Sequence, residues 1–359
     1  MQQQENCRVQ FRQEVILLKI LIIGTSFVGG GRERSLEYKN FLVSKGYIVD
    51  LVQFPGENFS LKYWYYYQRA LSLLSGHETG HMRKISNKLE RRIKTKHYDA
   101  VIGVETPWSY VLTKDLDCLK IFSCESLWSE ELPSSPNGEC SERVRDLREA
   151  ELEILKKSDY VVFPWKTTEN YFREKVWAGK NYITIKYGCH PQNKTPSFSS
   201  PISIISLGNL GSSWSNGELL SYLTQISPYT IDVFSSYKPQ SKHRLNYKGF
   251  APSLDILTNY QFGLNTISKN VYRQNHFSSR VLTYLSYGLP VLSPDWLKFT
   301  HELKGIIHYN ENNFLEVIKE NSGFEKWEKL SKEAHQQAVD LDWKLTLEPL
   351  EKILTSVHK

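Results

Sequence analysis

The chain has 359 residues, 40% of them hydrophobic and 23% charged. This composition indicates a globular protein, and the length suits two domains better than one core. The sequence contains no run of about 18 apolar residues, which excludes a conventional transmembrane helix. The net charge of +6 favours a polyanionic partner or an anionic membrane surface, but no nucleic-acid-binding motif accompanies it, so nucleic acid is not an expected partner.

The cysteine pattern and the first apolar run indicate a cytoplasmic protein. The five cysteines are odd in number and form no Cys-x-x-Cys pair, so we expect neither a disulfide framework nor a cysteine zinc site. Residues 15–24 are apolar except for Lys19, which interrupts the run. We therefore interpret this run as a first buried strand and not as a signal peptide.

The N-terminal half alternates strand-like and helical patterns. Strands are predicted over 15–24, 47–54, 99–104, 119–123, 159–164 and 182–187, and helices over 32–45, 83–96 and 141–157. This alternation predicts a parallel sheet that is covered by helices on both faces.

A proline-rich segment then separates two similar halves. Prolines 191, 196 and 201 predict a linker over 191–201 between domains at 1–190 and 202–340. Further strands are predicted over 202–208, 230–235, 245–249, 261–267, 289–292 and 305–309, with helices near 217–227 and 253–259. Two open α/β sheets of this kind bind ligands at the carboxyl ends of their strands, in a shared cleft.

The stretch 275–294 is the most informative part of the chain. Val281, Leu282 and Leu285 recur at helical spacing, and Gly288 stands where this helix would end. Ser278, Ser279 and Arg280 therefore fall at the helix N-terminus. Unpaired amides and the helix dipole favour an anion there, and an arginine adds a charge-assisted contact to phosphate.

This stretch resembles the donor-binding region of GT-B glycosyltransferases. The matching positions are Phe277, Ser279, Arg280, Tyr284, Leu285, Gly288, Pro290 and Val291. The resemblance implies an α/β fold of two Rossmann-like domains facing a cleft, with a C-terminal helix at 341–359 that crosses back to the first domain. It also implies a nucleotide diphosphate sugar as co-substrate, with no cofactor and no metal.

The resemblance also assigns roles to two glycine turns. Gly208 and Asn209 end the first strand of the second domain, where the family places a small residue against the donor diphosphate. The run Gly29, Gly30, Gly31 and Arg32 follows the first strand of the chain and corresponds to a loop beside the diphosphate and the acceptor. A glycine turn without any ligand is the alternative interpretation of this run.

The chain departs from the family at two glutamates that normally contact the donor. Asn275 and Thr283 occupy those positions, so Thr283 is a candidate partner for a ribose hydroxyl, and Asn275 or His276 for a sugar hydroxyl. The departure leaves retaining and inverting chemistry both open. It makes the chain similar to divergent or inverting members, such as the glucuronosyltransferase of xanthan synthesis, in which an N-domain carboxylate deprotonates the acceptor.

Two glutamates are candidates for that catalytic base. Glu105 and Glu125 each follow a strand of the first domain and should face the cleft. We rank Glu105 first because Pro107 and Trp108 should fix its loop. The alternative for each glutamate is a carboxylate that caps the next helix.

Two other signals compete with this interpretation. Residues 77–81 read His-Glu-Thr-Gly-His, which matches a zinc-peptidase motif, but Gly76 and Gly80 disfavour the helix that the motif requires. The aromatic run 63–67 and the basic helix 83–96 could form a membrane-interfacial patch or line the acceptor site, and ordinary core packing is the alternative.

The leading hypothesis is a cytoplasmic, metal-independent glycosyltransferase that works at the inner face of the membrane or away from it. It would transfer a sugar to a hydroxyl of a glycan, a lipid-linked molecule or a small molecule. The alternative is a catalytically degenerate GT-B protein that binds a nucleotide or a glycan.

Overall fold

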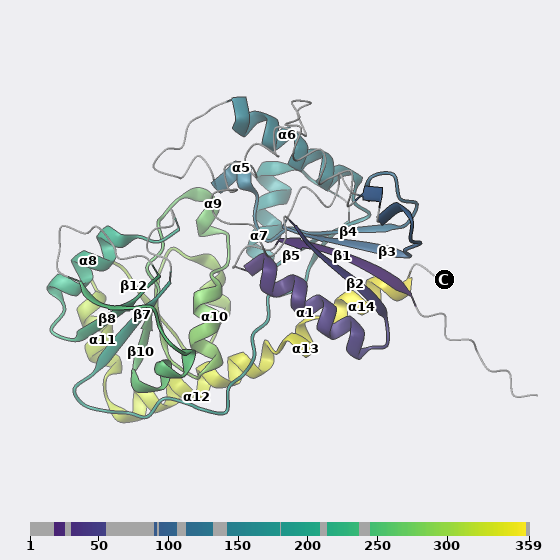
Figure 1. Ribbon diagram of the computed structural model, residues 1–359. Helices are drawn as coiled ribbons and strands as arrows, with labels where there is room; N and C mark the ends of the chain where they lie inside the picture. Colours follow the sequence, from purple (N-terminus) through teal and green to yellow (C-terminus); the bar gives the residue numbers. More distant parts are fainter. Residues whose placement is uncertain are drawn as a thin grey trace, which may run out of the picture.

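The protein forms two α/β lobes in a computed structural model (Figure 1). The structure describes residues 18–25, 30–54, 90–91, 93–105, 113–131, 142–179, 181–208, 214–236 and 245–356. Each lobe is built around one six-stranded sheet, and every described strand pair is parallel. The predicted fold class, two Rossmann-like α/β units, is confirmed.

The N-terminal sheet has the strand order β2-β1-β3-β4-β5-β6. Its central strands β1 and β3 are almost wholly buried because helices cover the sheet, which explains their continuous apolar sequences. The strands are β1 (Lys19–Thr25), β2 (Ile48–Phe54), β3 (Ala100–Val104), β4 (Leu119–Ser123), β5 (Tyr160–Phe163) and β6 (Tyr182–Thr184). The helices are α1 (Gly30–Ser44), α5 (Trp128–Glu131), α6 (Glu142–Lys157), α7 (Lys166–Tyr171) and the π-helix η3 (Phe172–Val176).

The C-terminal sheet has the order β12-β11-β10-β7-β8-β9. Its strands are β7 (Ser203–Leu207), β8 (Thr230–Phe234), β9 (Asn246–Gly249), β10 (Phe262–Leu264), β11 (Val291–Pro294) and β12 (Ile306–Tyr309). The helices are α8 (Gly217–Ile226), α9 (Val271–Gln274), α10 (Ser279–Ser286), α11 (Phe314–Asn321) and α12 (Phe324–Asp340), with 3-10 helices η4 (Leu254–Asn259) and η5 (Lys298–Glu302). Every strand predicted from the sequence is present.

Helix α10 is fixed to the C-terminal sheet by one tyrosine. The backbone N–H of Leu207 donates to the Tyr284 hydroxyl over 2.8 Å, and a Cβ on Gly263 would stand 2.5 Å from the Tyr284 ring. Gly288 has a φ of 69° and terminates the helix, as predicted, because glycine adopts this left-handed conformation at low cost. The start of α10 is thereby held at the edge of the sheet.

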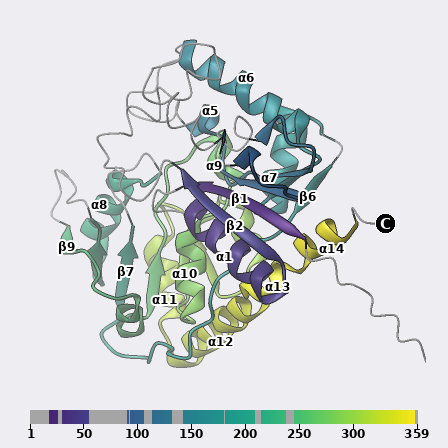
Figure 2. The same cartoon turned by 45° about the vertical axis from the view of Figure 1, so that its right-hand side comes forward.

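The C-terminal segment returns from the second lobe to the first (Figure 2). It continues beyond α12 as α13 (Trp343–Thr346) and α14 (Glu348–Ser356). The Trp343 ring contacts Tyr187 at a centroid distance of 4.7 Å, and Lys45, directly after α1, pairs with Glu351 of α14 over 2.7 Å. The predicted crossing is confirmed, although two short helices make it. The domain boundaries predicted at 190 and 202 stay predictions.

Candidate functional site

A cavity of about 880 Å³ lies between the two lobes. Its N-terminal wall comprises Gly30, Gly31, Glu105, Glu125 and Ser126, and its C-terminal wall includes Gly208, Trp214, Ser235, Thr266, His276, Ser278, Ser279, Arg280 and Thr283. Most of these residues follow the carboxyl ends of parallel strands or begin α10. The structure therefore brings most of the predicted site residues together in one cleft, where α/β proteins of this class bind ligands.

Arg280 is the cation of the C-terminal wall. Its Nη1 donates to the Thr266 carbonyl and its Nη2 to the Ser215 hydroxyl, each over 3.3 Å. Burial lowers the pKa of Arg280 from its ordinary value, but an arginine keeps its charge in proteins. Among the described residues, no carboxylate forms an ion pair with Arg280. Its charge is consequently available to an anionic ligand.

The N-terminus of α10 lies beside this guanidinium. The Ser278 hydroxyl donates to Asn265 over 3.4 Å and does not cap the helix. The Thr283 hydroxyl lines the cavity and donates to the Ser279 carbonyl over 3.1 Å. The first-turn amides thus lack a side-chain cap, which is the arrangement that favours a bound anion.

Asn275 and His276 differ in what they present to the cavity. Asn275 does not line it, because its side chain donates to the Val271 carbonyl and accepts from Lys298, each over 2.8 Å. His276 lines the cavity and is buried. Burial, with the nearby charge of Arg273, lowers the pKa of His276 to about 3. Its Nδ1 accepts the Phe277 amide, so the neutral ring carries its proton on Nε2.

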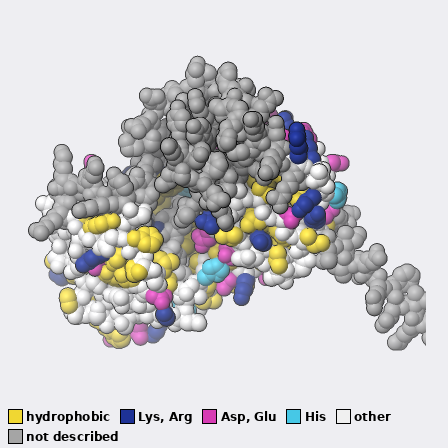
Figure 3. Space-filling model, viewed as in Figure 1, with side chains coloured by type: hydrophobic (Ala, Val, Ile, Leu, Met, Phe, Trp, Pro, Cys, Tyr) yellow, Lys and Arg dark blue, Asp and Glu magenta, His cyan; other side chains and the backbone are white. Residues whose placement is uncertain are grey.

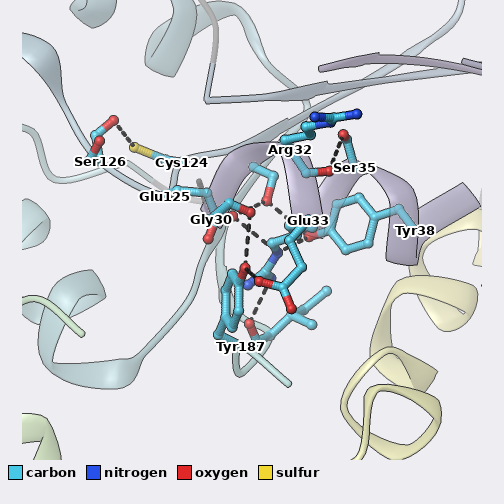
Figure 4. Close-up of polar contacts among 12 residues, drawn as sticks. Gly30, Arg32, Glu33, Ser35, Tyr38, Cys124, Glu125, Ser126 and Tyr187 are labelled. Carbon is cyan, nitrogen blue, oxygen red and sulfur yellow. Dashed lines mark hydrogen bonds and ion pairs between the residues drawn. The ribbon is translucent and has the colours of Figure 1, made fainter. Parts of the chain in front are cut away.

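The glycine turn of the N-terminal lobe lies under Glu105. A Cβ on Gly31 would stand 1.8 Å from Glu105 Oε2, so this approach requires glycine. Glu105 itself has a φ of 54°, a left-handed conformation that costs free energy for a residue with a side chain. Arg32 does not line the cavity and points away from Glu125 (Figure 4). The predicted residues Gly29 and Asn209 lie outside the described part of the chain.

Glu125 belongs to a buried hydrogen-bonded group behind the same wall. Its Oε1 lies 3.0 Å from Nε of Arg34 and accepts the Ser123 hydroxyl over 2.8 Å. Arg34 Nε also donates to the Tyr38 hydroxyl over 2.7 Å, and Tyr38 contacts Ser123 over 2.9 Å. Burial raises the pKa of Glu125, and the charge of Arg34 opposes this rise. The group gathers around the start of α1 (Figure 4).

The sequence interpretation missed Arg34 and Trp214. Arg34 and Tyr38 lie one helical turn apart on the face of α1 that buries Phe41 and Leu42, so the helical period was a usable signal for a buried arginine. Trp214 lines the cavity with the Arg273 guanidinium over its ring at 4.9 Å. No local pattern marked this contact, because Trp214 lies in a turn and Arg273 lies in α9, far apart in the sequence.

Several predicted features fall outside the described residues. These include the His-Glu-Thr-Gly-His motif at 77–81, the aromatic run 63–67 and most of the basic helix 83–96. Two described lysines of that helix are paired, Lys94 with Glu90 and Asp115, and Lys96 with Asp50. Basic and acidic side chains accordingly lie side by side on the described surface of this lobe (Figure 3).

The described segments contain neither a group of metal ligands nor a membrane-spanning helix. There, no three His, Cys, Asp or Glu side chains are grouped as a metal site would require. No helix in those segments is both long and apolar enough to span a bilayer.

Comparison with known proteins identifies the fold class. No protein-family model matches the chain, and no curated protein matches it by sequence. Among solved structures, sucrose-phosphate synthase from Thermosynechococcus elongatus aligns with a TM-score of 0.70 at 13% identity, over 95% of this chain and 99% of its own. HepE of Anabaena in complex with UDP-glucose aligns with a TM-score of 0.67 at 13% identity, over 94% and 100%.

A third structural relative extends the same likeness. CalG4, the calicheamicin glycosyltransferase, aligns with a TM-score of 0.55 at 12% identity, over 96% of this chain and 100% of its own. Together with the two parallel sheets and the returning C-terminal segment, these likenesses define the class: the chain has the GT-B fold of glycosyltransferases.

Proposed function

We propose that the protein is a glycosyltransferase that moves a sugar from a nucleotide diphosphate sugar to a hydroxyl. The observation that carries the proposal is the position of Arg280. An arginine without a carboxylate partner among the described residues lies beside the uncapped N-terminus of α10, in a cavity shared by two Rossmann-like lobes. This combination is suited to a diphosphate.

The donor can be placed along the C-terminal wall. We place its diphosphate between Gly208, Arg280 and the first turn of α10. Phe234, Phe250 and Leu254 line the same wall and offer an apolar surface to a nucleobase. HepE, a structural relative, binds UDP-glucose, which supports uridine as the first nucleotide to test.

Acceptor activation is assigned to the N-terminal wall. Glu105 and Glu125 both line the cavity, and a carboxylate within hydrogen-bond reach of an acceptor hydroxyl can act as a general base. Arg280 and the helix N-terminus would stabilise the departing diphosphate by preorganised electrostatics. The proposal includes no metal and no cofactor.

The finer assignments rest on the sequence. They comprise transfer of a hexose, a cytoplasmic location, a role in polysaccharide biosynthesis and peripheral contact with a membrane. The lack of a cysteine pairing pattern supports the cytoplasmic location, and the basic residues between 83 and 96 support the membrane contact. Hexose transfer and the role in polysaccharide biosynthesis rest on the resemblance to GT-B glycosyltransferases. The proposed acceptors are a glycan, a lipid-linked molecule or a small molecule.

A binding panel provides the first test. Affinities for UDP, GDP, dTDP and ADP, and release of each diphosphate from its glucose conjugate, should reveal one preferred nucleotide and its release. No affinity for any of the four would overturn the proposal.

The second candidate function is a binding protein without transferase activity. It is favoured by Asn275, whose side chain contacts Val271 and Lys298 instead of facing the cavity. Strong donor binding with no release of nucleotide diphosphate, in water or with an acceptor panel, would favour this candidate.

A further inference from the structure

The charges that line the cavity are divided between its two walls. Glu105 and Glu125 are the charged lining residues of the N-terminal wall, and Arg280 is the charged lining residue of the C-terminal wall, among the residues the structure describes. His276 also lines the cavity, but burial and the nearby charge of Arg273 lower its pKa to about 3, so it is neutral near pH 7. The wall assigned to the acceptor therefore presents carboxylates.

Glu125 has one carboxylate oxygen that is hydrogen-bonded to the protein and one without a partner among the described residues. These hydrogen bonds can form a chain with one direction. Arg34 Nε donates to the Tyr38 hydroxyl, Tyr38 donates to the Ser123 hydroxyl, and Ser123 donates to Glu125 Oε1. Oε2 is buried and accepts no hydrogen bond from the part of the chain that the structure describes, although Glu125 lines the cavity. A buried acceptor atom without a partner is costly, so Oε2 is suited to a ligand that donates a hydrogen bond.

Burial raises the pKa of Glu125, and the adjacent Arg34 opposes this rise and favours the charged carboxylate. An arginine stays protonated in proteins, and a buried cation requires a counter-ion. Arg34 is fully buried, and the ion pair that it forms within the described chain is with Glu125, over 3.0 Å. Among the described residues, the other titratable groups that interact with Glu125 are Tyr38 and Tyr187, and Glu105 lines the same wall. The tyrosines are uncharged near pH 7 because burial raises the pKa of each above its ordinary value.

Glu105 is held at the same wall by backbone geometry. Its left-handed φ of 54° and its close approach to Gly31 direct the carboxylate across the glycine turn. Ser126 donates a hydrogen bond to Oε1 over 3.3 Å. Two carboxylates thus flank the first turn of α1, and a serine hydroxyl donates a hydrogen bond to Oε1 of each.

We propose that this wall binds an uncharged polyol, such as a sugar, as the acceptor, and that it rejects phosphorylated acceptors. The inference rests on the proposed function and names the acceptor class for it. Hydroxyls can donate hydrogen bonds to Glu105 and to Oε2 of Glu125, whereas a phosphate cannot donate when ionised and carries a like charge. Arg280 lies on the opposite wall, where the donor diphosphate would occupy it.

The test measures binding of matched acceptors to the protein saturated with UDP. The probes are methyl glycosides of glucose, galactose and mannose and their 6-phosphates, followed by ligand-observed NMR titration. We expect one or more uncharged glycosides to bind about tenfold or more tightly than their phosphates, as like-charge repulsion in a partly desolvated site implies.

Two variants link this preference to the carboxylates. Glu125→Gln and Glu105→Gln should each reduce the preference for the uncharged partner by about threefold to tenfold, because each removes one negative charge. Glu151→Gln is the matched control, since Glu151 is buried in the same lobe, accepts from Ser129 and does not line the cavity. It should leave the preference unchanged. If loss of the buried Arg34–Glu125 ion pair prevents Glu125→Gln from folding, the result for Glu105→Gln decides whether the inference holds.

Three results would overturn the inference. They are equal or tighter binding of the phosphates by the unmodified protein, an unchanged preference in the folded Glu variants, and no binding of any uncharged glycoside. Failure of UDP itself to bind would instead count against the proposed function. Binding of the same glycoside pairs can then be measured without nucleotide, so failure of the proposed function is distinguishable from failure of the acceptor inference.

Discussion

The guanidinium of Arg280 lies against the backbone of Gly208, so closely that a Cβ at position 208 would stand 2.2 Å from Nη2. Gly208 follows β7 with a φ of 137°, and Arg280 lies in the first turn of α10. The two residues come from segments far apart in the sequence, and the Tyr284 hydroxyl joins these segments through the Leu207 amide. The cationic part of the site is therefore built by the packing of α10 on the sheet.

Replacement of Arg280 should weaken nucleotide diphosphate binding and leave the fold intact. Arg280→Ala removes a charge-assisted contact, and we expect a loss of about 1.5–3 kcal/mol in the free energy of UDP or donor binding. Isothermal titration calorimetry measures the loss, and circular dichroism checks the fold. Arg148→Ala, at an exposed site with a weak contact to Glu130 at 3.8 Å, is the control. An unchanged diphosphate affinity would reject the assignment of Arg280.

A methyl group at position 208 should have a similar effect through displacement of the guanidinium. Gly208→Ala places its Cβ on Arg280 and also strains the backbone. Gly249→Ala separates the two effects, because Gly249 has a φ of 84° but nothing within 4 Å of its added Cβ. We expect weakened UDP binding in Gly208→Ala only. Equal UDP affinities in the two variants would mean that contact with Arg280 is unimportant.

The central strands could be predicted from the sequence because their residues are buried on both faces. Central strands such as β1 and β3 contain continuous apolar runs, and this signal is local. The helix end at Gly288 could also be predicted, since a glycine after a helical pattern commonly takes the left-handed conformation that ends a helix. These features depend on a few neighbouring residues, so one sequence was sufficient.

The contacts of the site were less predictable because they join distant segments. The sequence placed Glu105 and Arg280 in a cleft, but it did not indicate that Gly31 lies under Glu105 or that Arg34 pairs with Glu125. It also did not indicate that the Asn275 side chain is engaged by Val271 and Lys298. Such facts depend on how loops pack after the sheets have formed, which periodicity does not encode.

Loss of the Glu105 carboxylate should lower turnover with little change in donor affinity. Removal of a general base typically costs about 10²–10⁴ in rate, and Glu105→Gln keeps the size of the side chain above Gly31. We expect a larger loss in Glu105→Gln than in Glu125→Gln, measured as transfer to an accepted sugar at saturating donor. Normal turnover of Glu105→Gln would assign the base to Glu125 or another group, or would indicate a retaining reaction that needs no such base.

The stability of the N-terminal lobe should depend on pH through Glu169. Burial alone would raise the pKa of this carboxyl, but hydrogen bonds from Lys166, Thr184 and Arg173 lower it overall from its ordinary value of 4.5. A carboxyl whose pKa is lower in the folded state contributes stability above its unfolded pKa and loses it as the pH falls through the folded value. The contribution of Glu169 should therefore be complete above about pH 5.5 and decline below about pH 4.5.

The variant Glu169→Gln isolates this contribution. It should destabilise the protein by about 1–3 kcal/mol at pH 7, because it weakens charge-assisted hydrogen bonds at a buried position, and the difference from the unmodified protein should shrink as the pH falls from 5 to 3. Urea unfolding of both proteins at several pH values measures the difference. Glu153→Gln, at an exposed position of α6 beside Lys156 and Lys157, should show a much smaller effect at every pH. A Glu169→Gln deficit that stays constant across this range would mean that the carboxyl does not titrate with a lowered pKa in the folded protein.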